Sequence, residues 1–256
     1  FPNQPFIPAR PLRWHLFRFY REVQIMKITD LELVDVQQNI YDSFNGFMIS
    51  SDLKVFGKML ARTLLVQKVQ NVPGDIIECG IFKGTGFYNF LKLKRHLMPN
   101  TGKKIIGFDF FDTTALLNSL QDQNKEAMDT LFTGRGFGHE ESFYRFFQET
   151  LARNGFEKHE CELIKGDVSV TVPDYLAARP GLKISLLYMD LDLEKPTYDV
   201  LDAAWERLSH NGIVVFDEYA YHQWSESIGV DRFFADKKVD IKSLNFLAPS
   251  AYVVKK

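Results

Sequence analysis

Cysteine is scarce in this 256-residue sequence, which contains only Cys79 and Cys161. Both lie in apolar stretches that resemble strands, so we expect buried free thiols rather than a disulfide framework. A protein without disulfides fits a reducing compartment, and we take the cytoplasm as the expected location. Long apolar runs are also missing, since no stretch approaches the roughly 20 residues that a membrane-spanning helix needs.

An excess of charge of either sign is absent as well. The 31 basic and 33 acidic residues give a formal net charge of −2, so we expect no bulk attraction to nucleic acid or to an anionic membrane. Arginines at positions 10, 13, 18 and 21 interrupt the early apolar stretches and argue against a signal peptide. The hydrophobic content of 45% and the charged content of 25% are ordinary for a globular protein. The length allows one large α/β domain.

Residues 1–72 predict an extended arm followed by a helical extension. Prolines at positions 2, 5, 8 and 11 favour an extended chain because each fixes φ and removes a hydrogen-bond donor. Such an arm could reach a neighbouring subunit, which suggests a homo-oligomer. Residues 12–72 have apolar residues at helical spacing and end in the turn Val72-Pro73-Gly74. We treat this extension as part of the same domain as the core, residues 73–256.

After Gly74, short apolar runs alternate with amphipathic segments, which predicts a doubly wound, mostly parallel α/β sheet. The run at 184–189 is almost continuously apolar, as is typical of strands that helices cover on both faces. The segment near 110–160 predicts a substrate-side insert, in which the glycine-rich stretch 133–138 fits a ligand loop and a solvent loop equally well. We expect strands at 75–79, 104–109, 162–165, 184–190 and 212–217, helices at 87–97, 170–178, 196–208 and 225–236, and a hairpin of strands near 241–246 and 251–255 around Pro249.

Each predicted parallel strand delivers a carboxylate to the same edge of the sheet. An isolated acidic residue at a strand end usually caps a helix or forms a turn. Five such strand ends in succession instead predict a ligand site, because ligands of open parallel sheets bind beyond the carboxyl ends of the strands. The residues are Glu78, Asp109, Asp167, Asp190 with Asp192, and Asp217 with Glu218.

The turn after the first predicted strand is rich in glycine, which lets a cofactor approach the backbone at the start of a helix. Its glycines, Gly80, Gly84 and Gly86, do not follow the G-x-G-x-x-G spacing of dinucleotide-binding domains. A nicotinamide-dinucleotide oxidoreductase is therefore the competing interpretation rather than the leading one.

Five motifs together resemble the TylF-type methyltransferases, the family of macrocin O-methyltransferase. They are Glu78-Cys79-Gly80-Ile81-Phe82-Lys83-Gly84, Gly107-Phe108-Asp109, Gly166-Asp167-Val168, Met189-Asp190-Leu191-Asp192, and Asn211-Gly212-Ile213-Val214-Val215-Phe216-Asp217-Glu218-Tyr219. The resemblance covers roughly residues 70–236. It implies a Rossmann-like class I fold, S-adenosylmethionine as cofactor, a divalent cation that is usually magnesium, and methylation of sugar hydroxyls in natural products, as in antibiotic biosynthesis.

The resemblance also implies a role for each motif. Glu78 and the backbone from Gly80 through Gly84 and Thr85 to Gly86 would hold the methionine part of the cofactor, Asp109 its ribose, and Gly166-Asp167 would lie near its adenine. Asp190, Asp217 and Glu218 would bind the metal, and Asp192 would be the general base. The family usually has Asp-Asp-Tyr where this sequence has Asp217-Glu218-Tyr219, so the coordination at position 218 is the departure. His222 is an alternative base or a substrate contact.

We therefore predict a metal-dependent O-methyltransferase that acts on the sugar of a glycosylated natural product or glycan. Carboxylate oxygens suit magnesium, and no cluster of histidine and cysteine indicates zinc. A catechol-like or other small-molecule hydroxyl is the alternative acceptor. A binding module without activity is disfavoured because the acidic residues of the last two motifs are intact.

Overall fold

The computed structural model describes residues 37–134 and 143–256. The proline-rich arm and most of the glycine-rich stretch 133–138 lie outside these residues. None of the described helices combines the length and the apolar character that crossing a bilayer requires. Cys79 and Cys161 are both buried free thiols, which confirms the expectation for them.

The described strands form one sheet in the order β3-β2-β1-β4-β5-β7-β6. The five strands from β1 to β5 are parallel, whereas β7 runs antiparallel to β5 and to β6. This confirms the Rossmann-like fold, including the late hairpin. The bounds are β1 (Asp75–Cys79), β2 (Ile105–Asp109), β3 (Cys161–Lys165), β4 (Ile184–Met189), β5 (Leu208–Phe216), β6 (Lys242–Ser243) and β7 (Ala251–Val254). Two strands differ much from their predicted ranges: β5 begins four residues earlier, and β6 has only two residues of the predicted 241–246.

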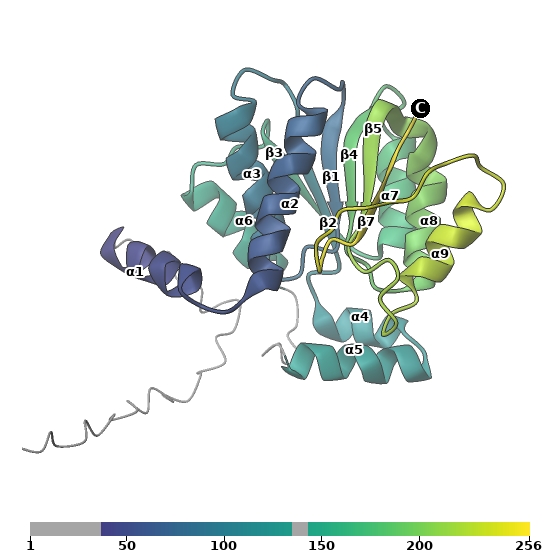
Figure 1. The fold of residues 1–256 in the computed structure, drawn as a ribbon, viewed down its shortest axis with the longest axis horizontal. Coiled ribbons are helices and arrows are strands. Elements are labelled where there is room, and N and C mark those ends of the chain that lie inside the picture. The colour runs from purple at the N-terminus through teal and green to yellow at the C-terminus, as the bar shows by residue number, and fades with distance from the viewer. Residues whose placement is uncertain (1–36, 135–142) are drawn as a thin grey trace, which may run out of the picture.

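Helices cover both faces of the sheet (Figure 1). One apolar cluster joins the sheet to α2 (Leu53–Val69), α3 (Thr85–Leu97) and α6 (Tyr144–Arg153). A second cluster lies on the opposite face. Its helices are α7 (Val168–Ala177), α8 (Glu194–Ala204) and α9 (Glu226–Phe234), with the short η2 (Trp205–Arg207) after α8. Helix α1 (Gln37–Met48) precedes α2, so the described part of the predicted extension is helical, as expected.

The predicted insert at 110–160 has two different parts. Helices α4 (Thr113–Ser119) and α5 (Asp122–Gly134) lie below the sheet in Figure 1, beyond the carboxyl ends of its strands. Helix α6 instead packs on the sheet, and its Phe147 is buried against Tyr88 of α3. The insert is therefore a helical pair at the ligand edge, followed by an ordinary crossover helix.

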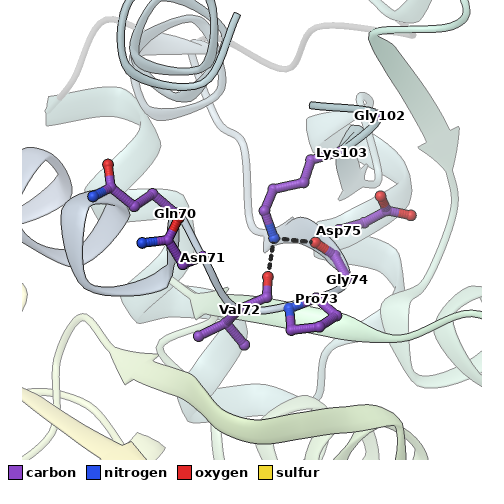
Figure 2. Close-up of a pocket in the computed structure, with 8 residues that line it drawn as sticks. All are labelled: Gln70, Asn71, Val72, Pro73, Gly74, Asp75, Gly102 and Lys103. Atoms are coloured by element: carbon purple, nitrogen blue, oxygen red, sulfur yellow. Dashed lines mark hydrogen bonds between the residues drawn. The ribbon is translucent and has the colours of Figure 1, made fainter. Parts of the chain in front are cut away.

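The amino ends of the strands hold a shallow hollow beside the start of β1 (Figure 2). Lys103 reaches across it and donates hydrogen bonds to the carbonyl oxygens of Val72 and, at 2.7 Å, Gly74. These contacts tie the connection between α2 and β1 to the chain entering β2. None of the predicted site residues lies in this hollow.

At the carboxyl edge, the turn after β1 runs against the end of β4. Gly80 has φ of +88°, and a Cβ there would lie 1.9 Å from the carbonyl oxygen of Asp190. Only glycine accommodates both the positive φ and the close approach. The first glycine of the predicted cofactor turn is thus required by the packing of two strand ends.

Candidate active site

A cleft of about 1110 Å³ opens at the carboxyl ends of the parallel strands, between the sheet edge, α2 and the α4–α5 pair. Its size exceeds that of most single-ligand sites, which span about 300–1,000 Å³. Nine predicted site residues line it: Glu78, Gly80, Thr85, Gly86, Asp109, Asp167, Asp190, Asp192 and Glu218. Asp217 is fully buried beside them. Gly84, Gly166 and His222 are not among the lining residues, and His222 is exposed with its ring stacked on Tyr221.

Asp109, at the end of β2, shapes the glycine-rich turn. Its Oδ2 accepts hydrogen bonds from the backbone N–H groups of Ile81 and Phe82 at 2.7 and 3.0 Å, and its Oδ1 accepts one from Phe111 at 2.8 Å. Burial raises the pKa of Asp109, and these donors oppose the rise. A carboxylate can accept about four hydrogen bonds, so Asp109 retains capacity for the predicted ribose contact.

Asp167 both caps a helix and lines the cleft. Its side chain accepts a hydrogen bond from the N–H of Ser169 at 2.9 Å and caps the start of α7. Asp167 also lines the cleft. The predicted adenine contact stays a prediction, and the capping role that is common for a strand-end aspartate is present as well.

Glu78 lies at the end of β1, and 1% of its surface is exposed. Its Oε1 lies 3.5 Å from Nη2 of Arg62 on α2. Burial is the main cause that raises the pKa of Glu78 to about 8, although Arg62 opposes the rise. Arg62 also lies over the ring of Tyr188, with Cζ 4.6 Å from the ring centroid.

Asp190 and Asp217, at the ends of β4 and β5, share one cation from α2. The ammonium of Lys58 lies 3.1 Å from Oδ2 of Asp190 and 2.5 Å from Oδ2 of Asp217. Tyr188 donates its hydroxyl hydrogen to the other oxygen of Asp217. Burial lowers the pKa of Lys58, but the charges of the two aspartates outweigh it, so the pKa is raised and Lys58 remains cationic.

Glu218 has a separate partner. Lys54 donates a hydrogen bond to its Oε1 at 3.1 Å, and the backbone N–H of Glu218 donates to Oε1 of Glu226 at 3.0 Å. Glu226 starts α9 and has no exposed surface. Burial and the charges of nearby aspartates raise the pKa of Glu226 well above its usual range, and its side chain holds the loop after β5 through the N–H of Glu218.

Asp192 lies beyond the end of β4 rather than within the strand. Strand β4 ends at Met189, and Asp192 has φ of +61°, so Asp190 and Asp192 do not share a face of an extended strand. Asp192 does not cap the next helix either, because the N-cap of α8 is Leu193. Both aspartates nevertheless line the cleft. Burial, then the charge of Asp190, raises the pKa of Asp192 well above its usual range.

The sequence analysis missed the cations of this site. Lys54, Lys58 and Arg62 stand at intervals of four residues on α2, which places them on one face of the helix. The signal was available as a basic stripe beside the apolar residues of a predicted helix. Glu226 was missed as well, because an acid in the first turn of a helix is common there for its favourable interaction with the helix dipole.

The predicted metal ligands do not form a metal centre in this arrangement. Among the described residues, no three histidine, cysteine or carboxylate side chains are grouped so that they could hold one ion. Lys58 lies between Asp190 and Asp217, and Lys54 holds Glu218. One oxygen, Oε2 of Glu218, is buried and has no hydrogen-bond partner in the described part of the chain.

The raised pKa of Glu226 predicts a pH dependence of stability. Its folded-state pKa lies above the unfolded value of about 4.3. Above that value the unfolded state loses this proton first, so the free energy of unfolding falls as pH rises, by up to about 1.36 kcal/mol per pH unit. The fall ends when the folded carboxyl ionises. Glu226→Gln keeps an oxygen acceptor for the N–H of Glu218 and cannot ionise. We expect its stability advantage over the wild type to grow from pH 5 to pH 8.

Denaturant unfolding across this range, in metal-free buffer, measures the effect. Glu126→Gln, at an exposed position of α5, is the matched control and should show no such trend. A stability difference for Glu226→Gln that does not change with pH would contradict the prediction.

Comparison with known proteins agrees with this geometry. Residues 58–246 match the model of the macrocin-O-methyltransferase (TylF) family. The crystal structure of CalS11, a calicheamicin methyltransferase, aligns with a TM-score of 0.70 and 27% identity over 89% of this chain and 88% of that chain. An apo structure of CalS11, described as a TDP-rhamnose 3′-O-methyltransferase, gives 0.67 and 25% over 89% of each chain.

The O-methyltransferase NovP aligns with a TM-score of 0.62 and 16% identity over 78% of this chain and 80% of that chain, which shows a common fold. No curated protein sequence matches the chain. The family match covers most of the chain, including every strand end that lines the cleft. The chain therefore belongs to the macrocin-O-methyltransferase (TylF) family and is an S-adenosylmethionine-dependent O-methyltransferase.

Proposed function

We propose that the chain methylates a hydroxyl on the sugar of a glycosylated natural product or of its activated sugar precursor. The observation that carries this proposal is the cleft, in which the glycine-rich turn after β1 faces the acidic ends of β4 and β5. One wall suits a nucleoside cofactor, and the other suits a hydroxyl that must lose a proton. CalS11, which is described as acting on TDP-rhamnose, supports a sugar as the acceptor.

The cofactor lies along the first three strand ends in this proposal. Glu78 and the turn Gly80–Gly86 contact its methionine part, Asp109 accepts from the ribose hydroxyls, and Gly166-Asp167 borders the adenine. The acceptor then occupies the space between the strand ends and the α4–α5 pair. A line from the acceptor oxygen through the methyl carbon to the sulfur is the geometry that methyl transfer requires.

Asp192 is the proposed general base. It lines the cleft and has no side-chain hydrogen bond to the described residues, so its oxygens are available to an acceptor hydroxyl. The raised pKa of Asp192, caused mainly by burial, makes it a stronger proton acceptor than an ordinary carboxylate once it is ionised. The exposed His222, which does not line the cleft, is the weaker candidate.

A divalent cation at Asp190, Asp217 and Glu218 is the further part of the proposal. All three donors are carboxylates, which are the oxygen ligands that magnesium prefers, and Oε2 of Glu218 is buried without a partner among the described residues. The three side chains are not grouped around one point in the described part of the chain, so a bound cation would have to draw them together. The ammonium of Lys58 already lies where two of the carboxylates meet, so a cation would replace it. A bound cation would lower the pKa of a hydroxyl that touches it.

Methyl transfer to a panel of acceptors tests the proposed function. We expect methylation of a nucleotide sugar or glycoside with S-adenosylmethionine as donor, detected by mass spectrometry, and none of catechol. We also expect S-adenosylhomocysteine to stabilise the protein thermally, because a ligand that binds only the folded state must do so. Methylation of catechol alone would contradict the acceptor class, and a melting shift with NAD but not with S-adenosylhomocysteine would contradict the reaction.

The exchange between Lys58 and a cation predicts opposite effects for two variants. Asp190→Asn should bind magnesium more weakly than the wild type, and Lys58→Met should bind it more tightly because no ammonium competes. Calorimetric titration of cofactor-bound protein measures both, and Lys68→Met, at an exposed position of α2, is the matched control. A chelator should abolish turnover. Unchanged magnesium affinity in both variants, or full turnover in excess chelator, would contradict the cation site.

The proposed base predicts a large and selective loss of rate. Asp192→Asn keeps the shape of the side chain but cannot accept a proton, so we expect single-turnover rates to fall by about 10²–10⁴-fold. Affinity for S-adenosylhomocysteine and for magnesium should stay within about twofold, since the other contacts remain. The wild-type rate should rise with pH as the carboxyl ionises. His222→Gln should be nearly silent, and a rate loss in that variant with none in Asp192→Asn would exchange their roles.

A further inference from the structure

Arg62 is a buried cation with too few partners. It is 4% exposed, and its guanidinium carries five N–H donors. The contact with Glu78 is long at 3.5 Å, and Nε is buried without a hydrogen-bond partner among the described residues. Unsatisfied buried donors on a charged group are costly. This arrangement therefore indicates that a ligand supplies the missing hydrogen-bond acceptor.

One oxygen of Glu78 lacks a hydrogen-bond donor among the described residues, just as Nε of Arg62 lacks an acceptor. Its Oε1 faces Arg62, and its Oε2 is buried without a partner in the part of the chain that the structure describes. Both side chains line the cleft. The cleft wall therefore presents donors of Arg62 and an acceptor of Glu78 side by side, which is the pattern that binds a zwitterion.

The start of α3 borders the same point. A Cβ at Gly86 would lie 2.0 Å from Oε1 of Glu78 and 2.7 Å from Nη2 of Arg62, so a larger residue here would displace both side chains from their present positions. The N-cap of this 13-residue helix is Gly84, which makes no side-chain cap, and the first turn contains no acidic residue. The positive end of the helix dipole thus adds to the charge of Arg62 in attracting an anion.

Arg95 shows how an arginine with a purely structural role is bonded in this protein, and Arg62 differs from it. Arg95 donates from Nε and Nη2 to the carboxylate of Glu160 at 3.0 and 2.7 Å and also donates to the carbonyl oxygen of Gly155. Arg62 has no such bidentate partner, although the ring of Tyr188 fixes its plane. Its position is held by packing, while its donors remain available.

We propose that Arg62 and Glu78 recognise the amino-acid end of the cofactor, Arg62 through the α-carboxylate and Glu78 through the α-ammonium group. This rests on the proposed function, which places the methionine part of S-adenosylmethionine at this turn. Arg62 is the addition: a cofactor contact supplied by α2 rather than by the sheet edge. It makes the protein selective for adenosyl ligands that carry an amino-acid group.

Two ligands that differ only in this group provide the test. S-adenosylhomocysteine has the amino-acid end, whereas 5′-methylthioadenosine has the same nucleoside and thioether without it. In Arg62→Met we expect calorimetric affinity for S-adenosylhomocysteine to fall by about 10- to 100-fold, the usual effect of losing a hydrogen bond to a charged group. Affinity for 5′-methylthioadenosine should stay within about twofold. Arg95→Met, the matched control, should leave both unchanged.

Equal weakening of both ligands would mean that Arg62 only shapes the cleft and would overturn the proposal, as would an unchanged affinity for S-adenosylhomocysteine. A wild type that binds neither ligand would instead contradict the proposed function.

A second arm leaves the protein intact. On the wild type, the analogue 5′-deoxy-5′-(3-aminopropylthio)adenosine lacks only the carboxylate and should bind about as weakly as S-adenosylhomocysteine binds to Arg62→Met. The two losses should not add when variant and analogue are combined, since both remove one interaction. Additive losses would overturn the assignment of the carboxylate to Arg62. If Arg62→Met does not fold, Arg62→Lys gives the same test with a smaller expected loss.

Discussion

The arrangement of this protein depends on the contact between the basic face of α2 and the acidic ends of the parallel strands. A parallel sheet brings the ends of its strands to one edge, and here those ends carry carboxylates that would repel each other at short range. Lys58 bridges two of them, while Lys54 and Arg62 each hold one more. Buried charges are tolerated only when they are paired. The carboxylates at this edge can therefore be buried together only because α2 supplies cations to pair with them.

Pairing within the site is incomplete, and this has consequences for function. Six acids meet three cations at this edge: Glu78, Asp190, Asp192, Asp217, Glu218 and Glu226 on one side, and Lys54, Lys58 and Arg62 on the other. Burial is the main cause that raises the pKa of Glu226 and of Asp192 well above their usual ranges, so these two acids carry a negative charge less readily than ordinary carboxyls do. A site with unbalanced negative charge attracts cationic ligands, and the sulfonium cofactor is itself a cation.

The sheet could be predicted from the sequence because its signals are local. Continuous apolar runs and the acid or glycine that follows each one gave the strands, their direction and their shared edge, as at Met189-Asp190. The site was only half predictable for the same reason. Lys58 and Asp190 are 132 residues apart, and no local pattern states that α2 crosses this edge. The geometry at Asp192 was also not predictable, because its φ of +61° belongs to a loop whose backbone is held by the distant Ser225, which donates a hydrogen bond to the carbonyl oxygen of Asp192.

Charge balance during the reaction links these features. The cofactor enters with a positive sulfur, and methyl transfer leaves that sulfur neutral, while the acceptor oxygen loses its hydrogen. If the proton stays on Asp192, one positive charge disappears at the sulfur and one appears a short distance away, so the total charge of the cleft does not change. The constant total charge is important in a buried site with many carboxylates. Removing the positive charge of the sulfur without replacing it would leave these carboxylates to repel each other at low dielectric, which is costly. As the proposed base, Asp192 would hold this proton more readily than an ordinary carboxylate because burial raises its pKa, while the cations of α2 would hold the neighbouring carboxylates in place.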